Sequence, residues 1–157
     1  MKFFCATIGL TLSISETVVS KLILEGRKHY PKEYGGILVG RYSDDSKACI
    51  VEDTILPQNH KSSRYAFERG KEGLAQKLSE LYEQTPRLIY IGEWHTHPDS
   101  APFPSATDKQ AMLQIANDNG VTIASPVLLI LGLNSTSYTL GAYLQFQNQL
   151  IRYEQQD

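Results

Sequence analysis

Apolar and polar residues alternate along the first part of the chain. Between Phe4 and Ile14 every second residue is apolar, which is the period of a β-strand with one buried face. Lys2 ahead of an apolar stretch also fits the start of a signal peptide, but no small-residue cleavage site follows before the next element. We therefore expect a strand at this end of the chain.

A helix is predicted directly after this strand. Ser13 and Glu16 form an S-x-x-E capping box, and the helical pattern continues to about His29, before Pro31. Its apolar stripe consists of Val18, Val19, Leu22 and Ile23. A stripe of this kind predicts a helix that packs one face against the core.

The next part of the chain predicts a hairpin, a polar loop and a second helix. The consecutive apolar residues Ile37, Leu38 and Val39 favour a strand buried on both faces, and residues 47–57 fit its partner across an S-D-D-S turn. Residues 58–71 are polar and predict a loop. A helix is expected over about 71–85, with an apolar side made of Leu74, Leu78, Leu81 and Tyr82.

Strands dominate the pattern of the second half. Residues 87–97 predict a strand, residues 105–119 a helix ended by Gly120, and residues 121–133 a buried strand interrupted by Pro126. The segment after Asn134 predicts one or two further strands, with a shared face made of Leu140, Ala142, Leu144 and Phe146.

Alternating helices and strands without a linker predict a single α/β domain over residues 1–157, in which helices flank a mixed β-sheet. With 157 residues and 41% hydrophobic residues, the chain is long enough for one core. The net charge of −2 argues against nucleic-acid binding, and no apolar run is long enough to cross a membrane. Cys5 and Cys49 lack metal-binding spacing and indicate buried thiols in a reducing cytoplasm rather than a disulfide.

Two histidines stand one residue apart in the segment G-E-W-H-T-H-P. On a strand, His95 and His97 point to one face, while Trp94 and Thr96 point to the other. The two Cα atoms would lie about 7 Å apart, so both imidazoles could reach one metal ion. A pair of surface histidines at a strand end would give the same pattern.

Asp108 adds a carboxylate to this pair. In the predicted helix it shares a face with Met112 and Ile115, and a carboxylate on a core-facing stripe needs a partner or a metal ion. It also fits position N3 of a capping box whose N-cap is Ser105. Both interpretations can hold together. With His95 and His97, Asp108 completes the two-nitrogen, one-oxygen ligand set of a catalytic zinc that keeps a fourth position for water.

A hydrolytic zinc site also needs a proton acceptor. Glu33, Glu52 and Glu93 are candidates because each lies near a glycine turn or a strand end. Glu93 should share the face of His95, and Glu33 directly precedes a glycine-containing strand that allows close backbone approach. The same ligand set occurs in non-haem iron oxygenases, although their usual motif places the carboxylate between the two histidines.

These motifs together resemble the JAB/MPN (JAMM) metalloproteases, which have a cytidine-deaminase-like fold. The resemblance rests on E-Y-G-G-I-L-V-G from Glu33 and on H-T-H-P-x6-S-x2-D from His95 to Asp108, and the chain is most similar to short prokaryotic members. It departs from many eukaryotic members in having Glu93-Trp94 where they carry a tryptophan followed by an aromatic residue. The resemblance implies that Zn²⁺ is held by His95, His97 and Asp108, that Glu33 is the general base, and that Ser105 stabilises the oxyanion.

The resemblance further implies a substrate class. Such enzymes cleave isopeptide or peptide bonds after the C-terminus of ubiquitin-like proteins, and short bacterial relatives resemble deconjugases of E1/E2-type systems in antiphage operons. We therefore expect a zinc isopeptidase acting on an E1/E2-conjugated protein. Alternatives are a peptidase that processes a sulfur-carrier protein and a non-catalytic MPN scaffold. The basic residues His60, Lys61, Arg64 and Arg69 could contact an extended peptide or be simply solvated.

Overall fold

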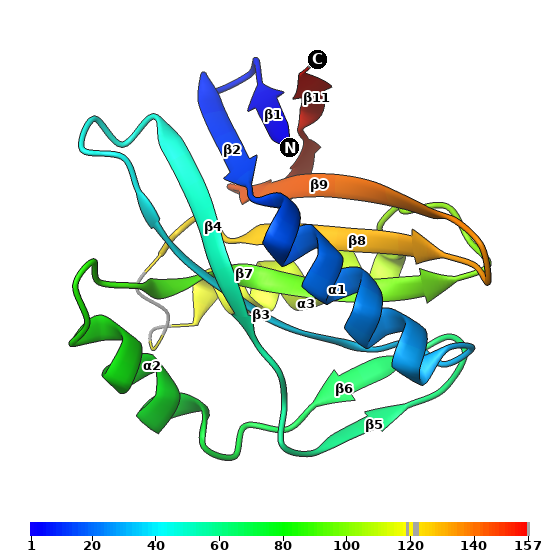
Figure 1. Ribbon diagram of the computed structural model, residues 1–157. Coiled ribbons are helices and arrows are strands. Elements are labelled where there is room, and N and C mark those ends of the chain that lie inside the picture. The colour runs from blue at the N-terminus through cyan, green and yellow to red at the C-terminus, as the bar shows by residue number, and fades with distance from the viewer. Residues whose placement is uncertain (119, 121–122, 157) are drawn as a thin grey trace.

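The computed structural model describes residues 1–118, 120 and 123–156, and in this part of the chain it contains a nine-stranded sheet, a two-stranded sheet and three helices. The main sheet has the order β10-β9-β8-β7-β3-β4-β2-β1-β11, in which β2–β4 and β7–β8 are parallel pairs and the other pairs are antiparallel. This arrangement confirms the predicted α/β class with a mixed sheet flanked by helices (Figure 1).

The strands of the main sheet are β1 (Lys2–Cys5), β2 (Leu10–Ile14), β3 (Gly35–Tyr42), β4 (Ala48–Ile55), β7 (Ile89–Pro98), β8 (Val127–Leu133), β9 (Tyr138–Phe146), β10 (Gln149–Arg152) and β11 (Glu154–Gln156). The small sheet pairs β5 (His60–Ser62) with β6 (Phe67–Arg69). The helices are α1 (Glu16–His29), α2 (Leu74–Tyr82) and α3 (Ala106–Asn117).

The N-terminal segment is a hairpin rather than the single predicted strand. β1 and β2 are antiparallel, with Cys5 opposite Leu10, and Gly9 in the turn has a left-handed φ of 67°. The buried positions are odd-numbered in β1, as at Cys5, and even-numbered in β2, as at Leu12, because the turn shifts the alternation by one residue. Phe4 was expected on the buried face and is instead exposed.

The first helix ends where predicted but has a different cap. Its N-cap is Ser15, whose hydroxyl accepts a hydrogen bond from the backbone N–H of Val18. Ser13 lies inside β2 and cannot cap the helix, because its backbone is already paired with neighbouring strands. The helix lies across one face of the main sheet (Figure 1), where its stripe buries Val18, Val19 and Leu22.

The predicted β3–β4 hairpin is confirmed, but the polar segment 58–71 is not only a loop. It contains the β5–β6 hairpin, in which His60 is paired with Arg69. The hairpin packs the partly buried Phe67 against the main core. The hairpin was not predicted because its strands have only three residues each and are mostly polar, so they show no hydrophobic periodicity.

The other two helices cover the face of the main sheet opposite α1. On β3, Leu38 belongs to the core under α1, whereas Ile37 and Val39 pack with Leu81 of α2. Met112 of α3 packs against Leu128 and Ile130 of β8, as well as Tyr143 of β9. The helix α2 is shorter than predicted and begins after Gly73, which has a left-handed φ of 70°. The helix α3 ends at Asn117, and the predicted end at Asn119 lies outside the described residues.

The last part of the chain forms three strands where one or two were expected. β8 begins directly after Pro126, and the predicted strand residues Val121 and Thr122 lie outside the described part. The shared face from Leu140 to Phe146 on β9 is confirmed. The consecutive strands β10 and β11 follow, and β10 pairs with β9 whereas β11 pairs with β1. The C-terminal segment therefore supplies the edge strand at each end of the main sheet.

Cys5 and Cys49 are buried free thiols, as predicted. None of the described helices combines the length and apolar character that a membrane span requires.

Candidate metal centre

The strand β7 places the two histidines on one face of the sheet. His95 lies opposite Gly35 of β3 on one side and Ile130 of β8 on the other. Trp94 and Thr96 point to the face covered by α1, where they are almost fully buried. The indole N–H of Trp94 donates to the hydroxyl of Thr54 at 2.7 Å, which holds the back of the ligand strand.

The N-terminal turn of α3 positions Asp108 beside the histidines. The Ser105 hydroxyl accepts from the backbone N–H of Asp108 at 3.1 Å, and the backbone N–H of Ser105 donates to Asp108 Oδ2 at 2.7 Å. The sequence therefore correctly predicted a reciprocal capping box. Met112, one turn further on, anchors the same helix face in the core.

Two imidazole nitrogens and the two oxygens of one carboxylate converge at this point. The Nε2 atoms of His95 and His97 lie 3.1 Å apart, His95 Nε2 is 3.2 Å from Asp108 Oδ1, and His97 Nε2 is 3.4 Å from Asp108 Oδ2. A tetrahedral ion with ligand bonds of 2.0–2.1 Å needs ligand atoms about 3.3–3.4 Å apart. One donor atom from each of the three side chains lies within 4.8 Å of the others, so the three side chains are close enough to share one metal ion.

The charges at the site favour a cation. Burial alone would raise the pKa of Asp108, but hydrogen bonds from His95 and His97 outweigh it and hold that pKa far below its usual range. Burial would lower the pKa of His97, but the Asp108 carboxylate outweighs that effect and raises it. A cation between the three groups would take both imidazole nitrogens and the carboxylate as ligands.

Two further polar side chains line the same cavity of about 340 Å³. Glu33, just before β3, and Ser105, the N-cap of α3, border it together with His95, His97 and Asp108. Burial raises the pKa of Glu33, and the nearby imidazoles lower it. The Ser105 oxygen already accepts the capping bond, which leaves its O–H available as a donor. All five residues singled out in the sequence are thus brought together.

The other two candidate bases are engaged elsewhere. Glu93 points to the ligand face, as expected, but its carboxylate accepts two hydrogen bonds from Arg69 and one from the Tyr90 hydroxyl. Glu52 pairs with Arg41 between β3 and β4. Neither Glu93 nor Glu52 borders the cavity that contains the ligand atoms.

The cavity also has residues that the sequence pattern did not assign to the site. The turn of the β5–β6 hairpin contributes Arg64, Tyr65 and Ala66 to its wall. Arg64 pairs with Asp99, and Arg69 pairs with Glu93, so neither basic residue is simply solvated. The basic composition of residues 58–71 indicated that these side chains could have a role. It could not identify Asp99 and Glu93 as the partners of Arg64 and Arg69, because these acidic residues are distant in sequence.

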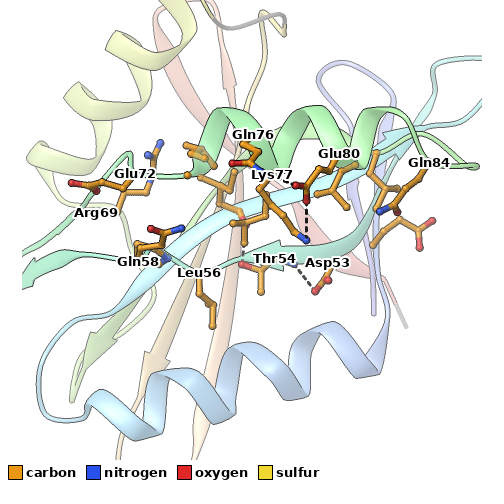
Figure 2. A pocket seen from close by; sticks show the side chains of 18 of the residues that line it. Asp53, Thr54, Leu56, Gln58, Arg69, Glu72, Gln76, Lys77, Glu80 and Gln84 are labelled. Carbon is orange, nitrogen blue, oxygen red and sulfur yellow. Dashed lines mark hydrogen bonds and ion pairs between the residues drawn. The ribbon is translucent and has the colours of Figure 1, made fainter.

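A larger cleft lies away from the metal ligands. It measures about 960 Å³ and lies between α2 and β4 (Figure 2). In Figure 2, Lys77 and Glu80 lie on the side of α2 that faces Asp53 and Thr54. Two ion pairs, Lys77–Glu80 and Lys21–Asp53, lie along this cleft. A choice of functional site by cavity size alone would therefore select this cleft, which is not lined by His95, His97 or Asp108.

Fold and site together give a candidate metal centre, in which two histidines and one carboxylate could hold a metal ion. Comparison with known proteins gives the family. The profile of the family "Prokaryotic homologs of the JAB domain" matches residues 15–141, and the chain belongs to this family. The predicted resemblance to JAB/MPN proteins is confirmed.

Proteins with functional names support the same grouping. The chain is 39% identical to a CD-NTase/cGAS isopeptidase of Enterobacter hormaechei over 134 residues, which cover 84% of this chain and 73% of that protein. It is 28% identical to a probable metalloprotease of Sinorhizobium fredii, over 75% of this chain and 73% of that protein. It is 24% identical to the yeast ubiquitin carboxyl-terminal hydrolase RPN11, over 73% of this chain but only 37% of that longer protein.

A solved structure has a similar fold. Protein DSY2949 from Desulfitobacterium hafniense superimposes with a TM-score of 0.70 at 21% identity, over 91% of this chain and 90% of that one. At this identity the similarity concerns the fold alone.

Proposed function

We propose that this protein is a zinc-dependent isopeptidase that removes a conjugated protein from its target by hydrolysing the amide after the conjugate's C-terminus. The main support is the convergence of donor atoms from His95, His97 and Asp108 in a cavity that Glu33 and Ser105 also line. The proposal treats residues 1–157 as one catalytic domain.

Zinc is the ion that this donor set favours. Two imidazole nitrogens and one carboxylate oxygen leave one position open, as in catalytic rather than structural zinc sites. When bound, Zn²⁺ lowers the pKa of water to about 7 and polarises the scissile carbonyl. An iron oxygenase could use the same ligand set. A hydrolase is favoured because it needs a proton acceptor, and the Glu33 carboxylate lines the same cavity.

Glu33 is assigned the proton transfers of the reaction. Its carboxylate accepts a proton from the attacking water and then delivers it to the leaving lysine amine, so that the amide bond is replaced by a carboxylate and a free amine. Burial raises the pKa of Glu33, and this brings its basicity closer to the working pH. The carboxylate must be ionised to act, so turnover is expected to fall as the pH falls through this raised pKa.

Ser105 is assigned the stabilisation of the oxyanion. Its hydroxyl oxygen is held by the capping bond from the Asp108 amide, which fixes the direction of the remaining donor. A donor aimed at charge that develops on the carbonyl oxygen strengthens in the transition state.

The proposed substrate is a cGAS-like nucleotidyltransferase joined through its C-terminus to a target lysine. The support is the name of the relatives, because CD-NTase/cGAS isopeptidases of Enterobacter hormaechei, Escherichia coli and Vibrio cholerae are 39%, 28% and 31% identical to this chain. These relatives favour deconjugation over the processing of a sulfur-carrier protein. A cytoplasmic role in antiphage defence is part of this proposal.

The decisive experiment uses a conjugate in which the C-terminus of such an enzyme is linked to a lysine ε-amine. We expect the zinc-loaded protein to release both components, and a chelator or Glu33→Gln to stop the release. Glu33→Gln removes the base but no ligand, so it should still bind one zinc per chain. Cleavage by Glu33→Gln at the wild-type rate would refute the assignment of the base. Absence of cleavage by the zinc-loaded wild type would refute the proposed substrate.

A further inference from the structure

The β5–β6 hairpin is attached to the ligand strand on both sides of the histidine pair. At the base of the hairpin, Arg69 Nε and Nη2 donate to Glu93 Oε2 and Oε1 at 2.9 and 2.7 Å, and Glu93 is two residues before His95. At its turn, Arg64 Nη2 donates to Asp99 Oδ2 at 2.6 Å, and Asp99 is two residues after His97. The two ion pairs therefore flank the ligand positions on β7.

Between these two attachments, the hairpin holds the backbone of Glu33. The backbone N–H of Glu33 donates to the carbonyl of Ser63 at 2.8 Å, and Ser63 itself closes the hairpin turn with a bond to Ala66 at 2.9 Å. Glu33 precedes β3, so the ladder of the main sheet does not pair its amide. Glu33 is therefore held on two sides. The hairpin holds it through Ser63, and β7 holds it through its neighbour Tyr34, whose amide donates to the Thr96 hydroxyl at 3.0 Å and whose carbonyl accepts from the Thr96 amide at 2.8 Å.

The attachment at the base is the stronger of the two. The side chains of Arg69 and Glu93 are only 21% and 13% exposed, and the Tyr90 hydroxyl gives Glu93 a third hydrogen bond at 3.0 Å. A bidentate, half-buried arginine–carboxylate pair is geometrically restrictive. Arg64 and Asp99 are 45% and 35% exposed, so solvent weakens that attachment.

We propose that Arg69 and Glu93 are positioning residues that, together with the pairing of β3 and β7, set the distance between the general base Glu33 and the metal ligands, because they fix the β5–β6 hairpin to β7. This inference rests on the proposed function, because it takes Glu33 as the base. Neither residue touches the reacting atoms. Their effect is geometric, and displacement of a catalytic group by about 1 Å can reduce the rate about 10²-fold.

The test compares two matched double variants. Arg69→Gln/Glu93→Gln removes the pair without leaving one charge unpaired. Arg41→Gln/Glu52→Gln removes another arginine–glutamate pair, which joins β3 to β4 outside the metal cavity. For each protein we would measure kcat and KM on the conjugate, zinc per chain, the thermal midpoint, and hydrogen exchange of the Glu33 amide.

We expect Arg69→Gln/Glu93→Gln to lower kcat about tenfold or more at full zinc loading, well below its thermal midpoint, and to speed exchange of the Glu33 amide about tenfold. The Arg41→Gln/Glu52→Gln control should change neither quantity. Unchanged kcat in the folded, zinc-loaded variant, or unchanged exchange of the Glu33 amide, would overturn the inference. If the wild type cleaves no conjugate, the proposed function fails, and the exchange comparison by itself decides whether the hairpin holds Glu33.

Discussion

Asp108 caps α3 and at the same time faces both imidazoles, a combination that the sequence analysis allowed. Its Oδ2 accepts the capping bond from Ser105 N at 2.7 Å and lies 3.4 Å from His97 Nε2, while Oδ1 lies 3.2 Å from His95 Nε2. The cap fixes the carboxylate in the orientation in which it faces the imidazoles. A capping interpretation and a ligand interpretation of the same residue are therefore not in competition.

Ser105 caps α3, and in the proposed mechanism it also stabilises the oxyanion, so substitutions can separate these two roles. Ser105→Ala should cost about 1 kcal/mol of stability through the lost cap, whereas Ser105→Gly should cost only a few tenths of that amount. Both variants lack the hydroxyl, so both should lose about 10²-fold or more in kcat if Ser105 stabilises the oxyanion. The measurement is kcat per folded, zinc-loaded molecule. A nearly fully active Ser105→Gly would show that the residue only caps α3.

Metal binding should displace a proton from His97. The Asp108 carboxylate raises the pKa of the His97 ring, so in the metal-free protein this ring is mainly protonated near pH 6, below the ordinary histidine pKa of about 6.5. A metal ion takes the neutral imidazole, and binding should therefore release close to one proton per ion at that pH. The number released from this ring should fall as the pH rises through the raised pKa. Titration calorimetry in buffers of different ionisation enthalpy measures this number, and no release near pH 6 would contradict the prediction.

At the scale of elements, the ligand strand is held between a helix and a hairpin. The helix α1 comes very close to β7, because a Cβ on Gly26 would lie 2.7 Å from Thr96 Cγ2 and 3.1 Å from Leu133 Cδ2. Thr96 is fully buried, and its hydroxyl accepts from the Tyr34 amide at 3.0 Å. The back of the histidine strand is therefore closely packed.

Gly26→Ala is a test of this packing. In an exposed helix the change would stabilise the protein by about 1 kcal/mol, but here the added methyl group should destabilise it by about 1–3 kcal/mol through overpacking. Ser20→Ala, at an exposed position of the same helix, is the matched control and should be close to neutral or slightly stabilising. Thermal unfolding of the two variants measures the difference. A Gly26→Ala protein that melts above the wild type would show that the helix can move away from β7.

Local signals predicted some elements well and failed for others. The apolar run in β3 and the end of α1 before Pro31 were predicted correctly, because burial and backbone geometry act locally there. The cap at Ser15 and the N-terminal turn were missed, because pairing of Ser13 with two strands is a tertiary event. The β5–β6 hairpin was missed for the same reason, since its contacts with β3, β7 and Glu33 are remote in sequence.

At the scale of the whole molecule, the C-terminal segment ties together strands from both ends of the sheet order. β10 pairs with β9, β11 pairs with β1, and Tyr153 between them is buried, with its amide donating to Ala142 O at 2.9 Å. The Tyr153 hydroxyl is buried and has no hydrogen-bond partner within the described part of the chain. The ring therefore contributes packing at this junction.

Tyr153 variants should change stability without changing the chemistry. Tyr153→Ala should cost about 3–5 kcal/mol, as expected for a large buried ring. Tyr153→Phe should be neutral or stabilising by up to about 1 kcal/mol, because it removes a buried hydroxyl that lacks a partner. Denaturant unfolding measures both changes, and kcat of the folded Tyr153→Phe protein should equal that of the wild type. A large loss of stability in Tyr153→Phe would indicate that the hydroxyl has a partner.

The sequence by itself determined the candidate ligand set. The two-residue spacing of His95 and His97 on a strand and the four-residue capping box from Ser105 to Asp108 are short-range features, and strand and helix geometry fixes them locally. Only the tertiary structure decided which glutamate joins the ligands. Glu93 has the better local position on β7, but Arg69 and Tyr90 engage it, whereas Glu33 reaches the cavity through the pairing of β3 with β7. That choice depends on contacts between segments far apart along the chain, which no local pattern encodes.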